Sequence, residues 1–209
     1  MWARVSPSNE ILKIIRHAKP ITIDGIQHPR SIFNLWSDAE KAAIGIYPVQ
    51  DTGHPDSHFY TWGAPTSTFN TVTKVVEISY SATEKSLNDT LWTSQDQTDG
   101  AIPTKKSVGD VKTQGLKNDQ ITRSKQIANS LLSSTDWYVT RSTERSKAIP
   151  SVVNTYRAAV ISTLDTMETK IKDAATFSVF KALYENEYYA NATLKAASVI
   201  HTWPDSLED

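Results

Sequence analysis

The feature that most constrains this chain is a stretch, residues 93–117, in which apolar side chains are scarce. The stretch contains three of the seven glycines of the chain, together with Pro103. Such a composition cannot bury enough apolar surface to offset the entropy lost on ordering. We therefore expect a polar linker or arm over residues 84–117, between two parts that pack separately. The few aliphatic residues of 93–117 are Ala101, Ile102, Val108, Val111 and Leu116.

The part before the linker, residues 1–83, has the pattern of a small β-rich domain. Apolar and polar residues alternate within 72–80, which suits a strand with one solvated face. Asp24-Gly25 lies between alternating residues and predicts a tight hairpin, because a type I′ turn needs positive φ at both central positions. The turn-forming cluster 7–9 separates two short apolar runs.

One short helix is expected inside this β-rich part. Ser37 and Glu40 have the spacing of a capping box, in which each side chain binds the backbone amide of the other residue. Gly45 follows at a position suited to ending the helix.

Aromatic residues are interleaved with turn-forming residues over 50–70, where we expect a loop and an irregular hairpin. Either these rings cover a small β core, or they bind a partner. Phe59, Tyr60 and Trp62 are accordingly candidate partner-binding residues.

Beyond residue 118 the apolar residues recur at steps of three and four, which is typical of amphipathic helices. Pro150 stands where a helix often starts. Shorter helices are expected over 84–92 and near 194–200. The sequence therefore predicts an α+β protein in which residues 118–209 form a helical hairpin or bundle. The apolar positions are Ile121, Ala128, Leu131, Leu132, Val153, Tyr156, Val160, Leu164 and Met167.

Charge and composition exclude several classes of protein. The 22 basic and 23 acidic residues give a net charge of -1, which argues against nucleic-acid binding driven by bulk charge. The absence of cysteine excludes disulfides and thiolate chemistry. No apolar run is long enough for a membrane span, and the first residues lack the pattern of a signal peptide. We expect a protein of the cytoplasm without nucleic-acid or membrane partners.

Motifs for catalysis are absent from the sequence. There is no Gly-x-Ser-x-Gly, no Gly-x-Gly-x-x-Gly and no phosphate-binding loop. His54 and His58 have a helical ligand spacing, but Pro55 between them argues against the helix that would align them. We expect a polar loop there. No catalytic residue, metal or cofactor is therefore assigned, and the protein is not expected to be an enzyme.

A motif in the helical part carries a family resemblance. Residues 127–137 end in Leu-Leu-Ser-Ser-Thr-Asp-Trp, and after a variable loop a helix starting at Pro150 carries Tyr156-Arg157. With Arg123 in the first helix, this arrangement resembles the C-terminal module of phage tail assembly chaperones. The segments 2–5 and 23–48 also resemble N-terminal parts of tail-associated proteins from tailed bacteriophages.

The resemblance implies a non-catalytic chaperone that binds phage tail or tail-fibre proteins in the host cytoplasm during assembly. The middle of the chain departs from the family pattern, because glycines and a proline replace a charged continuous helix. The alternative is a structural component of the virion, such as a tail-fibre, baseplate or tail-tip protein, which takes part in an oligomeric viral assembly.

The same motif also has a purely structural interpretation. Thr135 and Asp136 can cap the turn between two helices, and Arg157 can pair with Asp136. Trp137 is expected to be buried between the helices, with Tyr156 packed against it. Either the motif fastens the fold, or Trp137, Tyr156 and Arg157 contact a partner.

Overall fold

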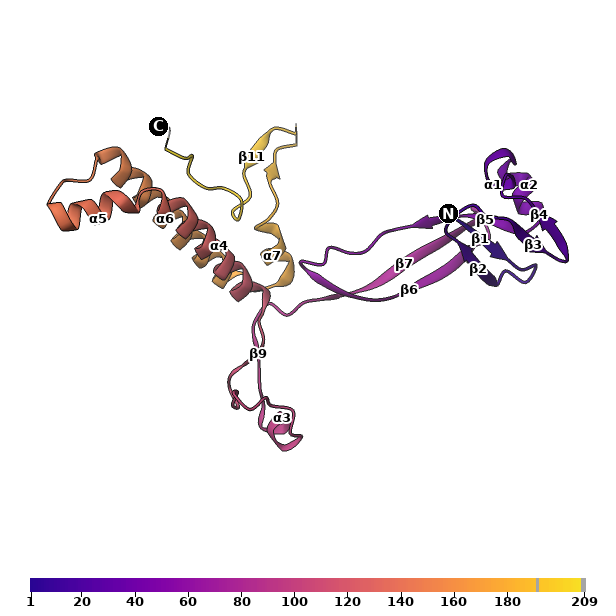
Figure 1. Ribbon diagram of the computed structural model, residues 1–209, viewed down its shortest axis with the longest axis horizontal. Coiled ribbons are helices and arrows are strands. Elements are labelled where there is room, and N and C mark those ends of the chain that lie inside the picture. The colour runs from indigo at the N-terminus through magenta and orange to yellow at the C-terminus, as the bar shows by residue number, and fades with distance from the viewer. Residues whose placement is uncertain (191, 208–209) are drawn as a thin grey trace. The chain divides into compact units, whose positions relative to one another are not determined.

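The computed structural model describes residues 1–190 and 192–207, and the chain divides into two compact units (Figure 1). The first unit is Met1–Glu84 and the second is Lys85–Asp209. The first is β-rich and the second contains the long helices, so the predicted α+β class is confirmed.

A five-stranded sheet with the order β2-β1-β5-β7-β6 forms the frame of the first unit. Strands β5 and β7 pair in parallel, and the other neighbours are antiparallel. The strands are β1 (Trp2–Val5), β2 (Ile11–Ile15), β5 (Ile46–Asp51), β6 (Tyr60–Asn70) and β7 (Val75–Glu84).

A separate hairpin confirms the predicted turn at Asp24-Gly25. Strands β3 (Ile21–Ile23) and β4 (Ile26–His28) pair in antiparallel fashion, and the two turn residues have φ of 51° and 82°. Ile23 packs into a cluster with Ile15, Phe33 and Ile46, and Phe33 comes from the one-turn helix α1 (Ile32–Leu35). The hairpin is thereby anchored on the sheet by apolar contacts.

The capping box of the next helix, α2 (Asp38–Ala43), is also confirmed. The Ser37 amide donates to Glu40 Oε2 at 2.8 Å, and the Glu40 amide donates to Ser37 Oγ at 3.3 Å. The Ser37 hydroxyl and amide together hold the pKa of Glu40 below its usual value. Gly45 has φ of 72°, and a Cβ there would lie 2.6 Å from the Val5 carbonyl oxygen, so the chain needs glycine at this point.

The alternation of apolar and polar residues predicted within 72–80 is confirmed for residues 76–79 of β7, and the predicted start of the strand is corrected. Val76 and Ile78 are buried, and Ser79 is exposed. Val72 is 88% exposed because residues 71–74 form the turn between β6 and β7, in which Lys74 has φ of 58°. The strand therefore begins at Val75.

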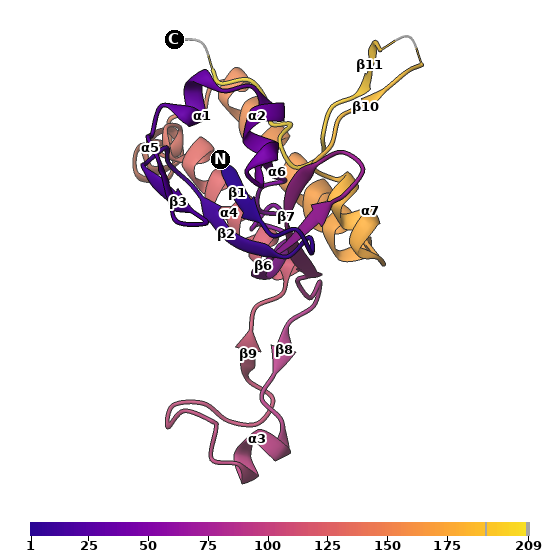
Figure 2. The same ribbon diagram turned by 90° about the vertical axis from the view of Figure 1, so that its right-hand side faces the viewer.

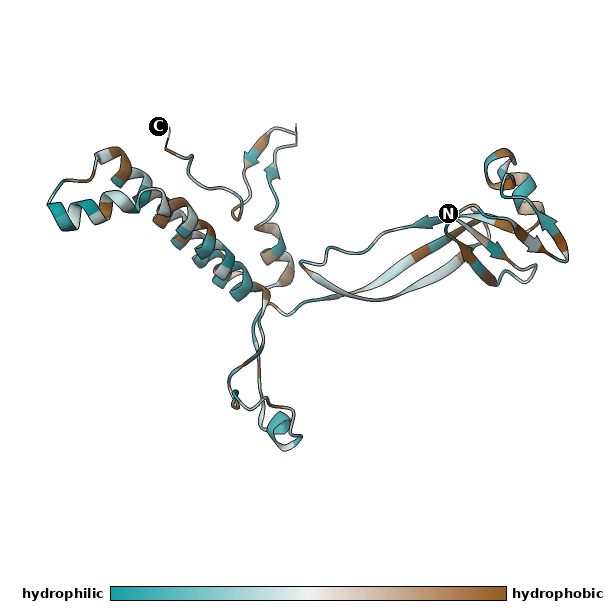
Figure 3. Ribbon diagram, viewed as in Figure 1, coloured by the Kyte–Doolittle hydropathy of each residue, from teal (hydrophilic) through white to brown (hydrophobic). Residues whose placement is uncertain are grey.

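Beyond Ile78 the strands β6 and β7 continue as a two-stranded ribbon. Pairing with β5 ends at the match of Asp51 with Ile78, whereas β6 and β7 stay paired to Tyr60 and Glu84. Every residue of 61–68 and 79–84 except Tyr80 is exposed, and Figure 3 colours most of this ribbon in pale, intermediate shades. His54 packs on Trp62 and Tyr80, and the rest of the first unit leaves the ribbon largely uncovered.

The second unit is built on two long helices, α4 (Leu116–Ser133) and α6 (Ser151–Asp173), which pack against each other. Shorter helices α5 (Asp136–Arg145) and α7 (Phe177–Ala182) follow them in the chain. Pro150 stands directly before α6, as its fixed φ favours.

Two expected helices are wrong. Residues 85–89 are irregular because the carbonyls of Ser86 and Leu87 accept hydrogen bonds from the amides of Leu116 and Lys117, so they are not available to a local helix. Near the C-terminus, β10 (Glu187–Tyr188) pairs with β11 (Leu194–Ala196) in place of the expected helix. Leu194 is exposed whereas Ile200 is buried, so the apolar residues of this segment do not form one buried helical stripe.

The predicted polar linker contains local structure that polar groups maintain. A hairpin of β8 (Thr90–Leu91) and β9 (Val111–Thr113) carries the short helix α3 (Ser94–Thr98) beyond it (Figure 2). The α3 helix has a Thr93–Asp96 capping box, and Lys112 Nζ contacts Asp96 Oδ1 at 2.6 Å. The same ammonium lies 4.7 Å from the centre of the Trp92 ring. These contacts take the place of the apolar core that the composition cannot supply.

The two ends of this segment are joined at the start of α4. Asp89 Oδ1 accepts the Gly115 amide at 2.7 Å, and its Oδ2 accepts the Asn118 side-chain amide at 2.7 Å. The helix has no side-chain cap of its own, so a residue from 26 positions upstream satisfies part of its first turn.

Among the described residues, no helix combines the length and the apolar character needed to cross a membrane.

Replacing Asp89 with alanine removes both of these bonds. We expect Asp89→Ala to lower the free energy of unfolding of the second unit by about 1–2 kcal/mol, as for the loss of a helix cap. Urea denaturation followed by circular dichroism measures the change. Asp165→Ala is the control, because that exposed carboxylate forms no ion pair within residues 1–190 and 192–207. Equal stability of the two variants would contradict the role of Asp89.

The pKa of Asp96 reports on the α3 hairpin. The hydrogen bond from Lys112, followed by those from Thr93, lowers the pKa of Asp96 from 3.8 to about 2. A depressed folded-state pKa means that the stabilisation is complete above pH 3.8 and is lost as the pH falls towards 2. In Lys112→Gln we expect this pKa to rise towards 3.8, measured from the carboxyl carbon chemical shift during an NMR titration. An unchanged value would show that Lys112 does not hold the hairpin.

Candidate functional site

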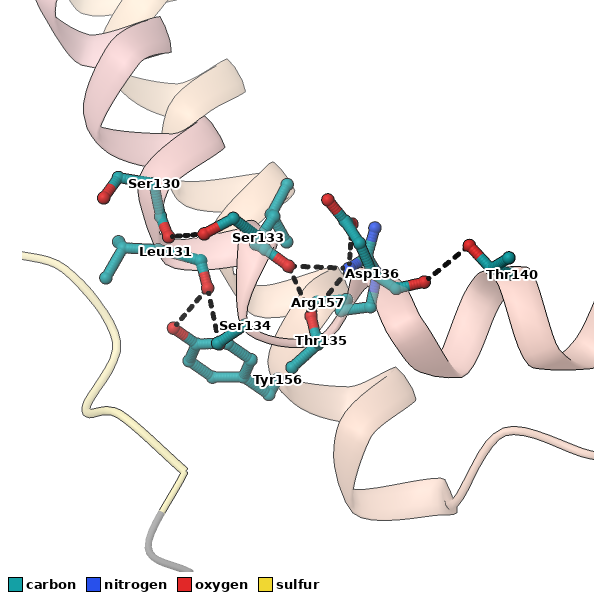
Figure 4. A network of polar contacts seen from close by, with 10 residues as sticks. Ser130, Leu131, Ser133, Ser134, Thr135, Asp136, Thr140, Tyr156 and Arg157 are labelled. Atoms are coloured by element: carbon teal, nitrogen blue, oxygen red, sulfur yellow. Dashed lines mark hydrogen bonds and ion pairs between the residues drawn. The ribbon is translucent and has the colours of Figure 1, made fainter.

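The Thr-Asp-Trp motif forms the junction between α4 and α5, where Arg157 from α6 reaches it (Figure 4). The Arg157 Nη1 donates to the Leu132 carbonyl at 3.0 Å, to Thr135 Oγ1 at 2.6 Å and to Asp136 Oδ1 at 2.9 Å. The predicted pairing of Arg157 with Asp136 is thereby confirmed.

These contacts provide hydrogen-bond donors for carbonyl groups at the end of α4. The last carbonyls of a helix have no partner within the helix. The Leu132 carbonyl accepts from the Thr135 amide and hydroxyl as well as from Arg157. Thr135 is buried, and its hydroxyl both donates to Leu132 and accepts from Arg157. The buried Thr135 hydroxyl thus has both a donor and an acceptor, and it links the end of α4 to α6 directly before α5 begins.

Tyr156 belongs to the core between α4 and α6. The residue is 8% exposed, packs with Ala128 and Val160, and donates its hydroxyl to the Leu131 carbonyl at 3.4 Å. Its ring is therefore not available to a partner in this structure, which corrects the sequence-based expectation of a surface contact. Leu131, Leu132, Leu164, Trp203 and Leu207 border the same cluster.

Trp137 lies in solvent, so the prediction that it is buried between the helices is wrong. A new helix, α5, starts at Asp136. The Trp137 side chain is 57% exposed, and no residue of α5 is buried. Arg157 holds Asp136 at the start of α5, so the backbone that carries the exposed Trp137 side chain is held in place.

Arg141 and Arg145, which form a basic cluster in the sequence together with Lys147, lie one and two helical steps beyond Trp137. Residues four apart on a helix share a side, so Trp137, Arg141 and Arg145 follow one another along α5. The Arg141 guanidinium lies 5.1 Å from the centre of the Tyr138 ring, and its Nε is buried without a partner among the described residues.

The aromatic residues of the first unit separate into exposed and buried groups. His54 lies close to Trp62 and Tyr80, with ring centres 4.1 Å and 4.0 Å apart. Trp62 is 44% exposed and Tyr60 is half-buried, whereas Phe59 is only 6% exposed. Phe59 therefore belongs to the core, and Trp62 is the candidate that presents a ring from this unit.

The two histidines with ligand spacing belong to different contacts. His54 stacks on Trp62 and Tyr80, and His58 meets the edge of Phe59 at 4.6 Å between ring centres. Within residues 1–190 and 192–207, no group of three or more potential ligands gathers in a way that could hold a metal ion. What the two candidate sites offer is an exposed indole on a supported backbone, which suits contact with another polypeptide.

The network around Arg157 predicts different effects for two neighbouring changes. Arg157→Met removes the donors to Leu132, Thr135 and Asp136, and we expect a loss of about 1–2 kcal/mol in the free energy of unfolding. Trp137→Ala removes an exposed ring and is expected to change it by less than about 0.5 kcal/mol. Urea denaturation of both variants makes the comparison. A larger loss for Trp137→Ala than for Arg157→Met would show that the indole supports the fold.

We compared the chain with known protein families, curated proteins and solved structures. No protein-family model, curated protein or solved structure matches the chain.

Proposed function

We propose that this protein is a non-catalytic chaperone of bacteriophage tail or tail-fibre assembly that binds unassembled tail or fibre subunits. The observation that carries the proposal is the exposed Trp137, placed by the Arg157 network within the Leu-Leu-x-x-Thr-Asp-Trp motif. The resemblance of that motif to phage tail assembly chaperones supplies the class of partner.

Exposed tryptophan suits this role for energetic reasons. Tryptophan and arginine are enriched among the interface residues that contribute most to binding. Trp137 is the second residue of α5, and the first residue, Asp136, is already held by Arg157, so little backbone order has to be gained on binding. Arg141 and Arg145 follow Trp137 along the same helix and add charged donors to it.

The mechanism requires no chemical step. A tail or fibre subunit has apolar surfaces and strand edges that are covered only after assembly, and such surfaces aggregate when they are left exposed. Binding through Trp137 would cover one of these surfaces until the neighbouring subunit displaces the chaperone.

Affinity purification from infected cells tests this function. We expect the tagged full-length protein to recover a tail or tail-fibre protein, identified by mass spectrometry, and Trp137→Ala to reduce the recovery at least tenfold. Trp62→Ala is the matched variant, since it removes an exposed indole from the other unit. Recovery of no tail protein would refute the proposal, and loss with Trp62→Ala alone would move the site to the β6–β7 ribbon.

One observation favours a second candidate function, that of a structural component of the virion. The outer part of the β6–β7 ribbon is exposed on both faces, and a two-stranded ribbon is marginally stable in water by itself. Permanent neighbours in a tail or fibre would cover it. Mass spectrometry of purified particles separates the two functions, because stoichiometric presence supports the structural component and absence supports the chaperone.

A further inference from the structure

The hairpin formed by β10 and β11 projects from the second unit, away from α7 (Figure 2). Every residue of 185–190 and 192–197 is exposed. Tyr188, Tyr189 and Leu194 are exposed by 58%, 58% and 54% of their surface. A two-stranded hairpin is marginally stable in water by itself, and large apolar side chains that gather on an exposed element are typical of a binding surface.

The base of this hairpin is held by hydrogen bonds. Asn186 Oδ1 accepts the Ser198 amide at 2.8 Å, and the Leu183 carbonyl accepts the Ile200 amide at 3.1 Å. Ser198 and Ile200 are both buried. Because the base is fixed, little order has to be gained when the hairpin binds another surface.

A groove of about 480 Å³ lies in the same unit, between α6 and the segment 197–204. Apolar parts of Met167, Val199, Trp203 and Pro204 contribute to its lining. Pockets of this volume accommodate groups larger than one aromatic side chain. The lining comes from α6 and from residues beyond β11, so the groove does not hold the hairpin of its own chain.

Charge makes the hairpin and the groove complementary. Glu187 pairs with Lys195 across the hairpin at 3.1 Å, which leaves the carboxylate of Glu185 as the uncompensated charge of this segment. Lys170 is the charged residue in the groove lining. Within the described part of the chain, neither Glu185 nor Lys170 forms an ion pair. Opposite charges on two surfaces favour their association and fix its register.

We propose that the β10–β11 hairpin of a second copy of this chain docks in the groove beside α6, and that two copies exchange their hairpins in this way. The apolar side chains of each hairpin lie against the groove lining of the other copy, with Glu185 near Lys170. Because every copy carries both surfaces, a reciprocal exchange covers all of them and closes at a dimer. The dimer does not use Trp137, so it does not depend on the proposed chaperone function.

Sedimentation velocity of the purified full chain tests the dimer. We expect a concentration-dependent species of twice 23.3 kDa. Combining Tyr188→Ser with Tyr189→Ser should raise the dissociation constant at least tenfold, because aromatic anchors contribute strongly to interfaces. Both rings are exposed, so the variant should keep its fold. Val152→Ser is the matched control, because this exposed residue of α6 lies outside the groove lining, and it should dimerise as the unmodified chain does.

Charge reversal tests the contact between hairpin and groove. Lys170→Glu and Glu185→Lys are each expected to raise the dissociation constant about fivefold, and the two together to restore it, because opposite charges then meet again. A chain that stays monomeric up to about 100 µM would refute the proposal. A dimer that the tyrosine variant leaves unchanged, or a double charge variant as weak as the single ones, would also refute it.

Discussion

One guanidinium group determines how the helical unit is arranged around its motif. Arg157 closes the end of α4, engages the hydroxyl of Thr135 and holds the first residue of α5. Without it, the Leu132 carbonyl and the Thr135 hydroxyl lose a hydrogen-bond donor, and α6 no longer fixes the direction in which α5 leaves α4. Trp137, which comes directly after the residue that Arg157 binds, is 57% exposed.

Local signals in the sequence predicted the structure well where neighbouring residues decide it. The Ser37–Glu40 capping box and the Asp24-Gly25 turn depend on groups within a few positions of one another. The expected helix over 84–92 failed for the opposite reason. Carbonyls of that segment bind the start of α4, some 30 residues later, and no local pattern reveals such a partner.

The candidate site shows the same division. The pairing of Asp136 with Arg157 could be predicted because both residues belong to the motif and carry opposite charges. The exposure of Trp137 and the burial of Phe59 could not, since the environment of an aromatic ring depends on which distant elements cover it. The contact of Trp203 with the cluster around Tyr156 likewise joins residues far apart in the chain.

The hydrogen bond between Asp89 and the Gly115 amide affects how much the length of the segment between them can vary. Because the chain enters and leaves the β8–β9 hairpin at adjacent points, the intervening residues behave as an appendage on the helical unit. Insertions, deletions or a grafted peptide within 93–110 would leave the first turn of α4 unaltered. Related chains can therefore differ greatly in length here while sharing the same helical scaffold.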